Sequence, residues 1–169
     1  MNFDVFELKS SIIDLFTNRV LICAVFAWLM AQILKIFTSP KHRDGLSLLR
    51  FLLGSGGMPS SHSAVVTGAA FSCGILYGFG SPLFAISAVL AVVVMRDAAG
   101  VRRESGKQAA AINQMSRELN KKHKSTDFDL LTELLGHTPL QVFFGGVLGI
   151  VMAYCCQLLL FPALFGPLV

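Results

Sequence analysis

Four apolar stretches constrain this chain most, because they match the length that a bilayer imposes on a helix. A spanning helix needs about 17 to 25 residues, and three of the stretches reach that length. The third is shorter, so we expect it to tilt or to lie in a thinned bilayer. The stretches cover about 19–37, 62–80, 82–96 and 139–161. They predict an all-α integral membrane helical bundle of about four transmembrane spans, forming one domain over residues 1–169.

The composition supports a membrane protein over a soluble one. Charged residues make up 14% of the chain and hydrophobic ones 54%, with a mean hydropathy of +0.66, whereas soluble domains carry about 25% charged residues. The net charge is +4. Without a soluble basic fold, this charge favours an anionic lipid surface or an anionic substrate over a nucleic-acid partner.

The small residues and cysteines within the apolar stretches are predicted to be packing residues. Gly145 and Gly149 form a GxxxG pair, which allows two helices to approach closely. The four cysteines lie in apolar surroundings without a CxxC pair, so they predict neither a disulfide framework nor a zinc site. They are Cys23, Cys73, Cys155 and Cys156.

The polar parts of the chain also carry helical signals. Residues 3–16 show rough helical periodicity and predict an interfacial or packing helix. Residues 105–121 predict an amphipathic helix, and the charged run 121–128 after it predicts a mobile turn. The apolar face of the amphipathic helix consists of Ala109, Ile112, Met115 and Leu119.

Basic residues predict the orientation in the membrane. If the four spans alternate in direction, the polar segments 38–61 and 97–138 lie on the same side. Of the 14 lysines and arginines, only Lys9 and Arg19 fall on the other side. Because cytoplasmic loops are enriched in Lys and Arg, both polar segments are predicted to face the cytoplasm.

The stretch "LLGSGGMPSSHSAVVTG", residues 52–68, is too polar to be an ordinary part of a span. Pro59 suits the first turn of a helix, and Ser60 and Ser61 are suited to capping it. A helix N-terminus with free N–H groups attracts anions. His62 would then lie in the first turn, where it can donate a proton to a leaving oxygen. The alternative is a capped helix with an interfacial histidine.

Two further polar segments belong to the same predicted membrane edge. "DAAGVRRESGKQ", residues 97–108, holds Arg102 and Arg103, whose planar guanidinium groups suit a phosphate. The alternative for this cluster is an anchor for lipid headgroups. "ELLGHTPLQVFFGGVLG", residues 133–149, places His137 just before a proline-initiated apolar helix. Two histidines and an arginine pair would then share one face.

These motifs resemble the type 2 phosphatidic acid phosphatase and vanadium haloperoxidase superfamily. "PSSH" (59–62) is similar to its PSGH motif, and "LGHTP" is similar to the end of its third motif. Together, "GGMPSSHSA", "DAAGVRR" and "LLGHTP" resemble the divergent bacterial and plant-organelle branch of the superfamily. The resemblance covers roughly residues 28–152.

The resemblance implies a phosphatase that needs no metal or other cofactor and that works through a phosphohistidine. By this comparison His137 is the nucleophile and His62 the general acid. Arg102 or Arg103 clamps the phosphate, and Ser60 and Ser61 cradle it. The first motif of the superfamily is matched best by Lys35 with Arg43, and Arg50 is a rival for the arginine.

The sequence departs from the superfamily in two respects. An inserted polar segment, 104–132, separates the arginines from His137, so it has to fold away for both to reach one phosphate. The position four residues after the nucleophile usually holds an orienting carboxylate, and here it is Gln141. Asp97 or Glu133 would have to take over that role.

The predicted function is therefore a lipid-phosphate phosphatase, with phosphatidylglycerophosphate or phosphatidic acid as substrate. The predicted location is the bacterial inner membrane with the site facing the cytoplasm, and homo-oligomers are compatible with the sequence. One alternative is a non-catalytic membrane protein that binds anionic lipid or phosphate. Vanadate-dependent haloperoxidation uses the same kind of pocket but belongs to larger soluble chains.

Overall fold

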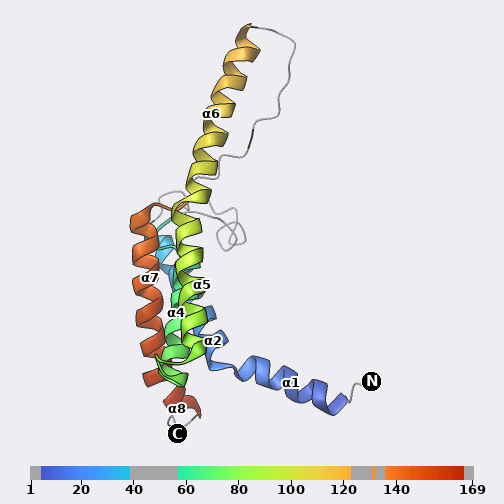
Figure 1. Cartoon of the computed structure of the whole chain (residues 1–169), viewed down its shortest axis with the longest axis vertical. Coiled ribbons are helices and arrows are strands. Elements are labelled where there is room, and N and C mark those ends of the chain that lie inside the picture. The colour runs from blue at the N-terminus through green and yellow to red at the C-terminus, as the bar shows by residue number, and fades with distance from the viewer. Residues whose placement is uncertain (1–4, 39–56, 123–130, 132–135, 166–169) are drawn as a thin grey trace.

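The computed structural model describes residues 5–38, 57–122, 131 and 136–165, and every regular element in them is helical (Figure 1). The all-α prediction is therefore confirmed. Most of the elements run parallel to the long axis of the molecule. They are α1 (Val5–Thr17), α2 (Arg19–Thr38), α4 (Ser61–Tyr77), α5 (Pro82–Ala99), α6 (Val101–Lys122), α7 (Pro139–Tyr154), the π-helix η2 (Cys155–Leu160) and α8 (Phe161–Phe165).

Helix α4 lies at the centre of the bundle and packs against α2, α5 and α7. The predicted close packing at the GxxxG pair is present on α7. A Cβ on Gly149 would overlap Thr67 Oγ1 and the carbonyl oxygen of Ala64. A Cβ on Gly145 would overlap the carbonyl oxygen of Ser60. These glycines let the backbones of α4 and α7 approach closely, as small residues do between membrane helices.

Local capping residues start the core helices. Ser60 caps α4 by accepting a hydrogen bond from Ser63 N, so Pro59 precedes the cap and does not occupy the first turn as we had predicted. Its peptide bond with Met58 is cis. Ser81 caps α5 ahead of Pro82, and Thr138 caps α7. Each cap satisfies backbone donors that the first turn of a helix leaves free.

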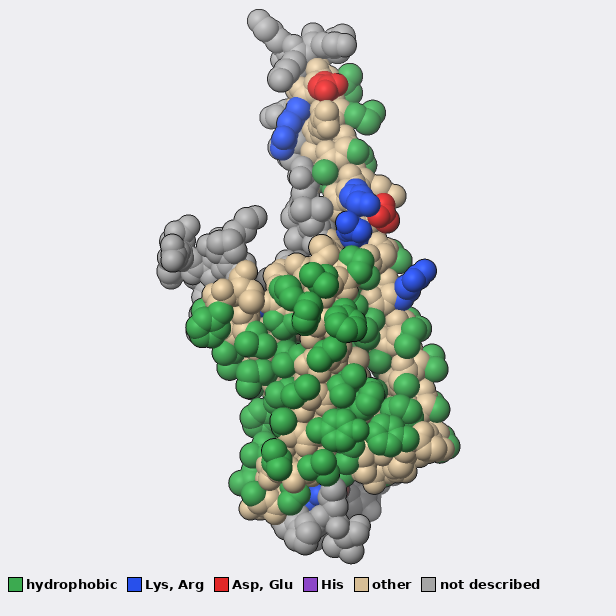
Figure 2. Space-filling model, turned by 90° about the vertical axis from the view of Figure 1, so that its left-hand side faces the viewer, with side chains coloured by type: hydrophobic (Ala, Val, Ile, Leu, Met, Phe, Trp, Pro, Cys, Tyr) green, Lys and Arg blue, Asp and Glu red, His purple; other side chains and the backbone are tan. Residues whose placement is uncertain are grey.

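Three helical rods are long and apolar enough to cross a membrane. They are Arg19–Thr38, Pro82–Asn120 and Pro139–Leu164, with mean hydropathies of 2.2, 1.9 and 2.1. The 17 residues of α4 are at the lower limit of a spanning length. Apolar side chains also cover much of the outer surface of the bundle (Figure 2). The chain is thus an integral membrane protein. The third span is longer than the predicted 82–96, because α5 runs to Ala99 and continues into α6.

Helices α1 and α6 extend away from the bundle at opposite ends (Figure 1). The helix predicted over 3–16 is observed as α1, which exposes Ile13 and Phe16. The amphipathic helix predicted over 105–121 is observed as α6. The mobile turn predicted over 121–128 lies almost wholly outside the described residues.

Candidate active site

The N-terminus of α4 forms the floor of the candidate site. Ser60 is completely buried, and its N–H donates to the carbonyl oxygen of Gln141 at 2.9 Å. This bond fixes the start of α4 against the start of α7. His62 follows in the first turn and is exposed, so its ring is accessible beside the helix terminus.

A buried cation approaches this floor from α2. Lys35 is 2% exposed, and its Nζ donates to Ser61 Oγ at 3.1 Å. Neither of the two ion pairs found among the described residues involves Lys35. A buried ammonium group is costly unless an opposite charge compensates it. The arrangement therefore suits a bound anion next to Ser61.

His137 is held by its own neighbours in the segment before α7. Its backbone N–H donates to Ala98 O at 3.2 Å, and its side chain is only 5% exposed. Its Nδ1 lies 3.3 Å from Gln141 Oε1. The same Oε1 accepts the N–H of Thr138 at 2.9 Å, which identifies that atom as the oxygen. Because a carbonyl oxygen only accepts, the proton of His137 lies on Nδ1 and its Nε2 is left with a lone pair.

The two histidines of the separate motifs come together. The ring centroids of His62 and His137 are 6.0 Å apart, with an angle of 60° between the ring planes. His62 comes from α4, and His137 from the segment that leads into α7. One ring is exposed and the other is buried, so the pair joins the solvent-accessible side of the site to its interior.

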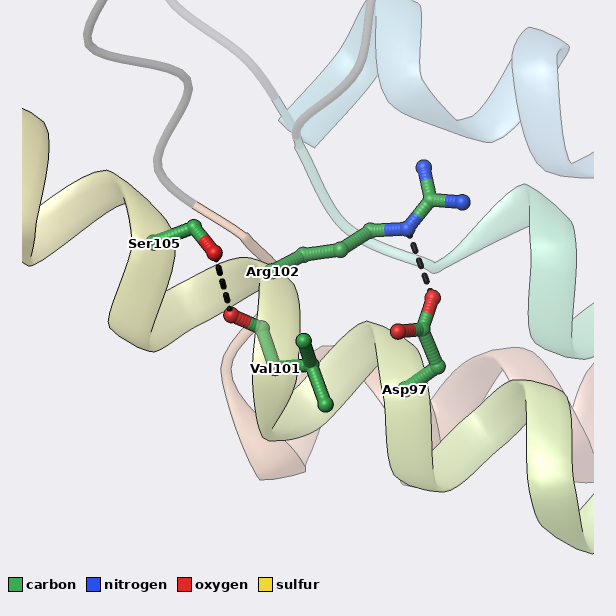
Figure 3. Close-up of polar contacts among 4 residues, drawn as sticks. All are labelled: Asp97, Val101, Arg102 and Ser105. Carbon is green, nitrogen blue, oxygen red and sulfur yellow. Dashed lines mark hydrogen bonds and ion pairs between the residues drawn. The ribbon is translucent and has the colours of Figure 1, made fainter.

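The positive charge of Arg102 acts on the site, where it lowers the pKa of His137. Its Nε donates to Asp97 Oδ2 at 2.7 Å, while its two terminal nitrogens point away from that carboxylate (Figure 3). In the same turn, Ser105 Oγ donates to Val101 O. Arg103 follows in the helix, so the two arginines diverge and do not converge in a turn. Asp97, which we expected to orient a histidine, pairs with Arg102.

Gly136 joins the histidine segment to the arginine helix. A Cβ at this position would overlap the backbone nitrogen of Arg103 and lie 2.7 Å from Arg102 C. Only a residue without a side chain fits there. The chain leaves the bundle through α6, and at Gly136 it again lies against the first turn of α6. His137 is therefore next to the junction of α5 and α6. This is the arrangement that the predicted insertion required.

The surroundings of His137 lower its pKa. Burial is the main cause, and the positive charge of Lys35, the His62 ring and the positive charge of Arg102 act in the same direction. The hydrogen bond with Gln141 raises the pKa in part. The net effect holds the pKa of His137 below its ordinary value of 6.5. The lowered pKa favours the neutral ring, and a neutral imidazole is the form that can act as a nucleophile.

Some of the predicted site residues are not placed. Arg43, Arg50 and Glu133 lie outside the described residues. Lys107 pairs with Glu104 at 2.7 Å on the exposed side of α6. Within the described part of the chain, no three His, Cys, Asp or Glu side chains come together as a metal site would require. Independence from a metal remains a prediction.

Gln141 has a positioning role that was not predicted from the sequence. Thr138 and Gln141 form a capping box, in which each side chain accepts the backbone N–H of the other. The T-x-x-Q spacing is readable from sequence. In the structure, the capping box fixes the side chain of Gln141. The oxygen that accepts the Thr138 N–H therefore also contacts Nδ1 of His137. The contact of Gly136 with the arginine helix leaves no comparable local signal.

Comparisons with known proteins show the family of this chain. A model of the family described as "Divergent PAP2 family" matches residues 16–152, a range that contains Lys35, His62, Arg102 and His137. The chain belongs to the divergent PAP2 family. A relative from Bacillus subtilis (strain 168), named "Uncharacterized membrane protein YuiD", is 39% identical over 152 residues. The match covers 82% of this chain and 94% of the relative. No solved structure matches the chain.

The PSSH, DAAGVRR and LGHTP segments all fall inside the matched range.

Proposed function

We propose that this protein is a membrane phosphatase that removes phosphate from a lipid through a phosphohistidine intermediate. The observation that carries the proposal is the meeting of His62 and His137 beside a buried lysine and a capped helix start. A nucleophile, a proton donor and groups that stabilise negative charge are the parts that phosphoryl transfer to a side chain requires.

In the proposed reaction, His137 Nε2 attacks phosphorus while the bond from phosphorus to the alcohol oxygen breaks. In its protonated form, His62 gives its proton to that oxygen, and the alcohol leaves. A water molecule then attacks phosphorus, with His62 accepting a proton from it. The phosphorus–nitrogen bond breaks, inorganic phosphate is released, and neutral His137 is restored. Gln141 holds the Nδ1 proton throughout.

Three groups are suited to neutralise the phosphate oxygens. Lys35 supplies a buried ammonium group, and the N-terminus of α4 supplies backbone N–H groups. Arg102 supplies the two terminal nitrogens that point away from Asp97 (Figure 3). Asp97 is then a positioning residue, because its ion pair limits where the guanidinium can lie.

A lipid substrate is supported by the apolar surfaces that adjoin the site. His62 begins a stripe of α4 that is not fully buried. Leu140 and Phe143 are exposed on the first turn of α7. An acyl chain next to these surfaces would leave its phosphate at the end of the bundle. The stripe continues through Val66, Ala69, Cys73 and Leu76.

The distribution of lysine and arginine supports a site facing the cytoplasm in the bacterial inner membrane. Lipids made on that leaflet, such as phosphatidylglycerophosphate and phosphatidic acid, are therefore the proposed substrates. One observation favours a second function, binding of an anionic lipid without turnover. Gln141 is neutral, and an amide stabilises a positively charged imidazole less than a carboxylate does.

Phosphate release by the purified protein in detergent, with EDTA present, tests the proposal. The substrates are phosphatidic acid, phosphatidylglycerophosphate and other lipid phosphates, and the variants are His137→Ala and the control Cys155→Ser. Cys155 is exposed at the opposite end of the bundle. We expect release by the wild type and the control, and loss of release in His137→Ala. Equal release by His137→Ala would reject the mechanism, and lipid binding without any release would support the second function.

A further inference from the structure

Helix α6 extends away from the bundle (Figure 1), and it carries an asparagine that binds the backbone of a residue far along the chain. Asn113 is 3% exposed. Its Nδ2 donates to Leu131 O, and its Oδ1 accepts the N–H of Leu131, both at 2.8 Å. One amide side chain thus binds both backbone polar groups of a single residue. We call this pair of hydrogen bonds the Asn113 anchor.

The Asn113 anchor lies on the side of α6 where a backbone can approach closely. At 100° per residue, every buried or half-buried residue between 101 and 120 lies within about 80° of Asn113. Most of these residues are small, and they are Arg103, Gly106, Ala109, Ala110, Asn113, Ser116 and Asn120. Asparagine is a poorer helix former than alanine. The contact with Leu131, and not the stability of the helix, therefore explains an asparagine at this position.

A second attachment fastens the same chain at the base of α6. A Cβ on Gly136 would overlap Arg103 N, so Gly136 lies directly against the first turn of this helix. From Arg103 to Asn113 the helix rises about 15 Å. Leu131 and Gly136 are five positions apart in the sequence, and five residues reach at most about 18 Å. The Asn113 anchor therefore limits how far Gly136 and the adjoining His137 can move away from α6.

We propose that Asn113 is a positioning residue for His137. On the C-terminal side of His137, the chain is fixed by the cap of α7, where Gln141 Oε1 contacts the His137 ring. On the N-terminal side, it is held by the contact of Gly136 at the base of α6 and by the Asn113 anchor. Without the anchor, the second of these restraints is lost. The imidazole can then shift, and a misplacement of about 1 Å can slow a reaction about 10²-fold.

Asn113 acts on His137 through the chain and not through the substrate, because it lies about 15 Å along α6 from the base of the helix. The inference deepens the proposed function, and its kinetic test rests on that function. The position of His137 can also be followed without turnover, because the accessibility of its ring depends on the same anchor. The two kinds of measurement therefore separate a failure of the proposed function from a failure of this inference.

Modification of histidine by diethyl pyrocarbonate tests the anchor without turnover. The reagent acylates neutral imidazole, and mass spectrometry of the peptides gives a separate rate for each histidine in one sample. His137 is 5% exposed, whereas His62 is exposed and serves as the internal reference. The variant is Asn113→Ala, and the matched control is Gln114→Ala at the next, exposed position of α6.

We expect the ratio of the His137 rate to the His62 rate to rise about tenfold in Asn113→Ala, because opening of the buried segment exposes the ring. In Gln114→Ala the ratio should stay at its wild-type value. An unchanged ratio in Asn113→Ala, or an equal rise in both variants, would overturn the inference. Asn113→Asp covers the case in which alanine disturbs α6, since aspartate has the same size but cannot donate to Leu131 O. It should raise the ratio about threefold or more, and a wild-type ratio would again overturn the inference.

Phosphate release from phosphatidic acid in detergent distinguishes positioning from a general loss of stability. We expect kcat of Asn113→Ala to fall about tenfold while KM changes less than about twofold, because alignment of the nucleophile and not binding is lost. The Tm should equal that of Gln114→Ala. With an active wild type, an unchanged kcat in Asn113→Ala or an equal fall in Gln114→Ala would overturn the inference. A wild type that releases no phosphate from any lipid would reject the proposed function, and the histidine modification ratio would still decide whether Asn113 positions His137.

Discussion

The imidazole rings of His62 and His137 lie edge to face with their centroids 6.0 Å apart. Each is tied to a different backbone feature. His62 belongs to the first turn of α4, and His137 is fixed by Ala98 O and Gln141 Oε1. The exposed ring can exchange protons with water, whereas the buried ring has its tautomer set by the helix cap. This asymmetry supports the proposed roles, with His62 as the general acid and His137 as the nucleophile.

Replacing His62 by alanine should slow phosphate release in a way that depends on the leaving group. For a lipid alcohol, loss of the general acid should lower kcat by about 10² to 10⁴. For p-nitrophenyl phosphate, whose leaving group needs no proton, the loss in the first step should be much smaller. Burst-phase kinetics with both substrates measure this difference.

The control for that experiment is His137→Ala, which should abolish release from both substrates because it removes the attacking atom. If His62→Ala slowed the two substrates to the same extent, His62 would not act as the general acid.

The rate should fall at acid pH with a midpoint below 6.5. Burial lowers the pKa of His137, with the charges of Lys35 and Arg102 acting in the same direction. The reactive neutral ring is therefore kept until the pH drops through that lowered pKa. The profile of kcat/KM against pH reports this group in the free enzyme. An acid limb centred at or above 6.5 would contradict the assignment.

Gln141→Glu should move this acid limb to higher pH. A carboxylate in place of Gln141 Oε1 favours the protonated ring, and an adjacent opposite charge shifts a pKa by about 1 to 3 units. Glutamate also preserves the capping box with Thr138, so α7 should still start normally. The same kcat/KM profile checks the shift. An unchanged limb would show that the hydrogen bond at Nδ1 does not tune the reactive group.

Lys35→Met should weaken vanadate binding and raise the thermal stability of the protein. Inhibition by vanadate should weaken by about tenfold or more, because one buried positive charge next to the anion is lost. Thermal stability should rise, because a buried ammonium group with no carboxylate partner among the described residues is removed. The inhibition constant and Tm in detergent test both effects. Lys107→Met is the control, since Lys107 is exposed and paired with Glu104. A fall in Tm for Lys35→Met would mean that Lys35 stabilises the fold.

Gly149→Ala should destabilise the bundle, because its methyl group would overlap Thr67 Oγ1 and the Ala64 carbonyl oxygen. Overpacking of this kind costs about 1 to 3 kcal/mol. Gly80→Ala is the matched control, because no atom lies within 4 Å of the added Cβ. Thermal unfolding in the same detergent compares the two. Equal Tm values would show that α4 and α7 accommodate the added methyl group without a loss of stability.

Local patterns predicted most of the elements and the identity of the central residues. Apolar length predicted α2, α5 and α7, because the bilayer thickness fixes how long an apolar helix must be. The serines at 60 and 61 correctly predicted the start of α4. Pro59 was predicted to lie in the first turn, but it precedes the N-cap Ser60. The amphipathic period predicted α6, but not that it continues α5 as one rod. The two helices are continuous because Gly100 donates to Arg96 O and accepts from Glu104 N, so the backbone hydrogen bonds run from α5 into α6.

The sequence by itself determined that this is an all-α membrane protein and which polar motifs adjoin its spans. Those features follow from length, periodicity and capping, which are local. Only the tertiary structure decided that His62 and His137 meet, and that Gly136 and His137 lie against the junction of α5 and α6. Contacts between distant segments are set by packing, and packing is not encoded in any single stretch of the chain.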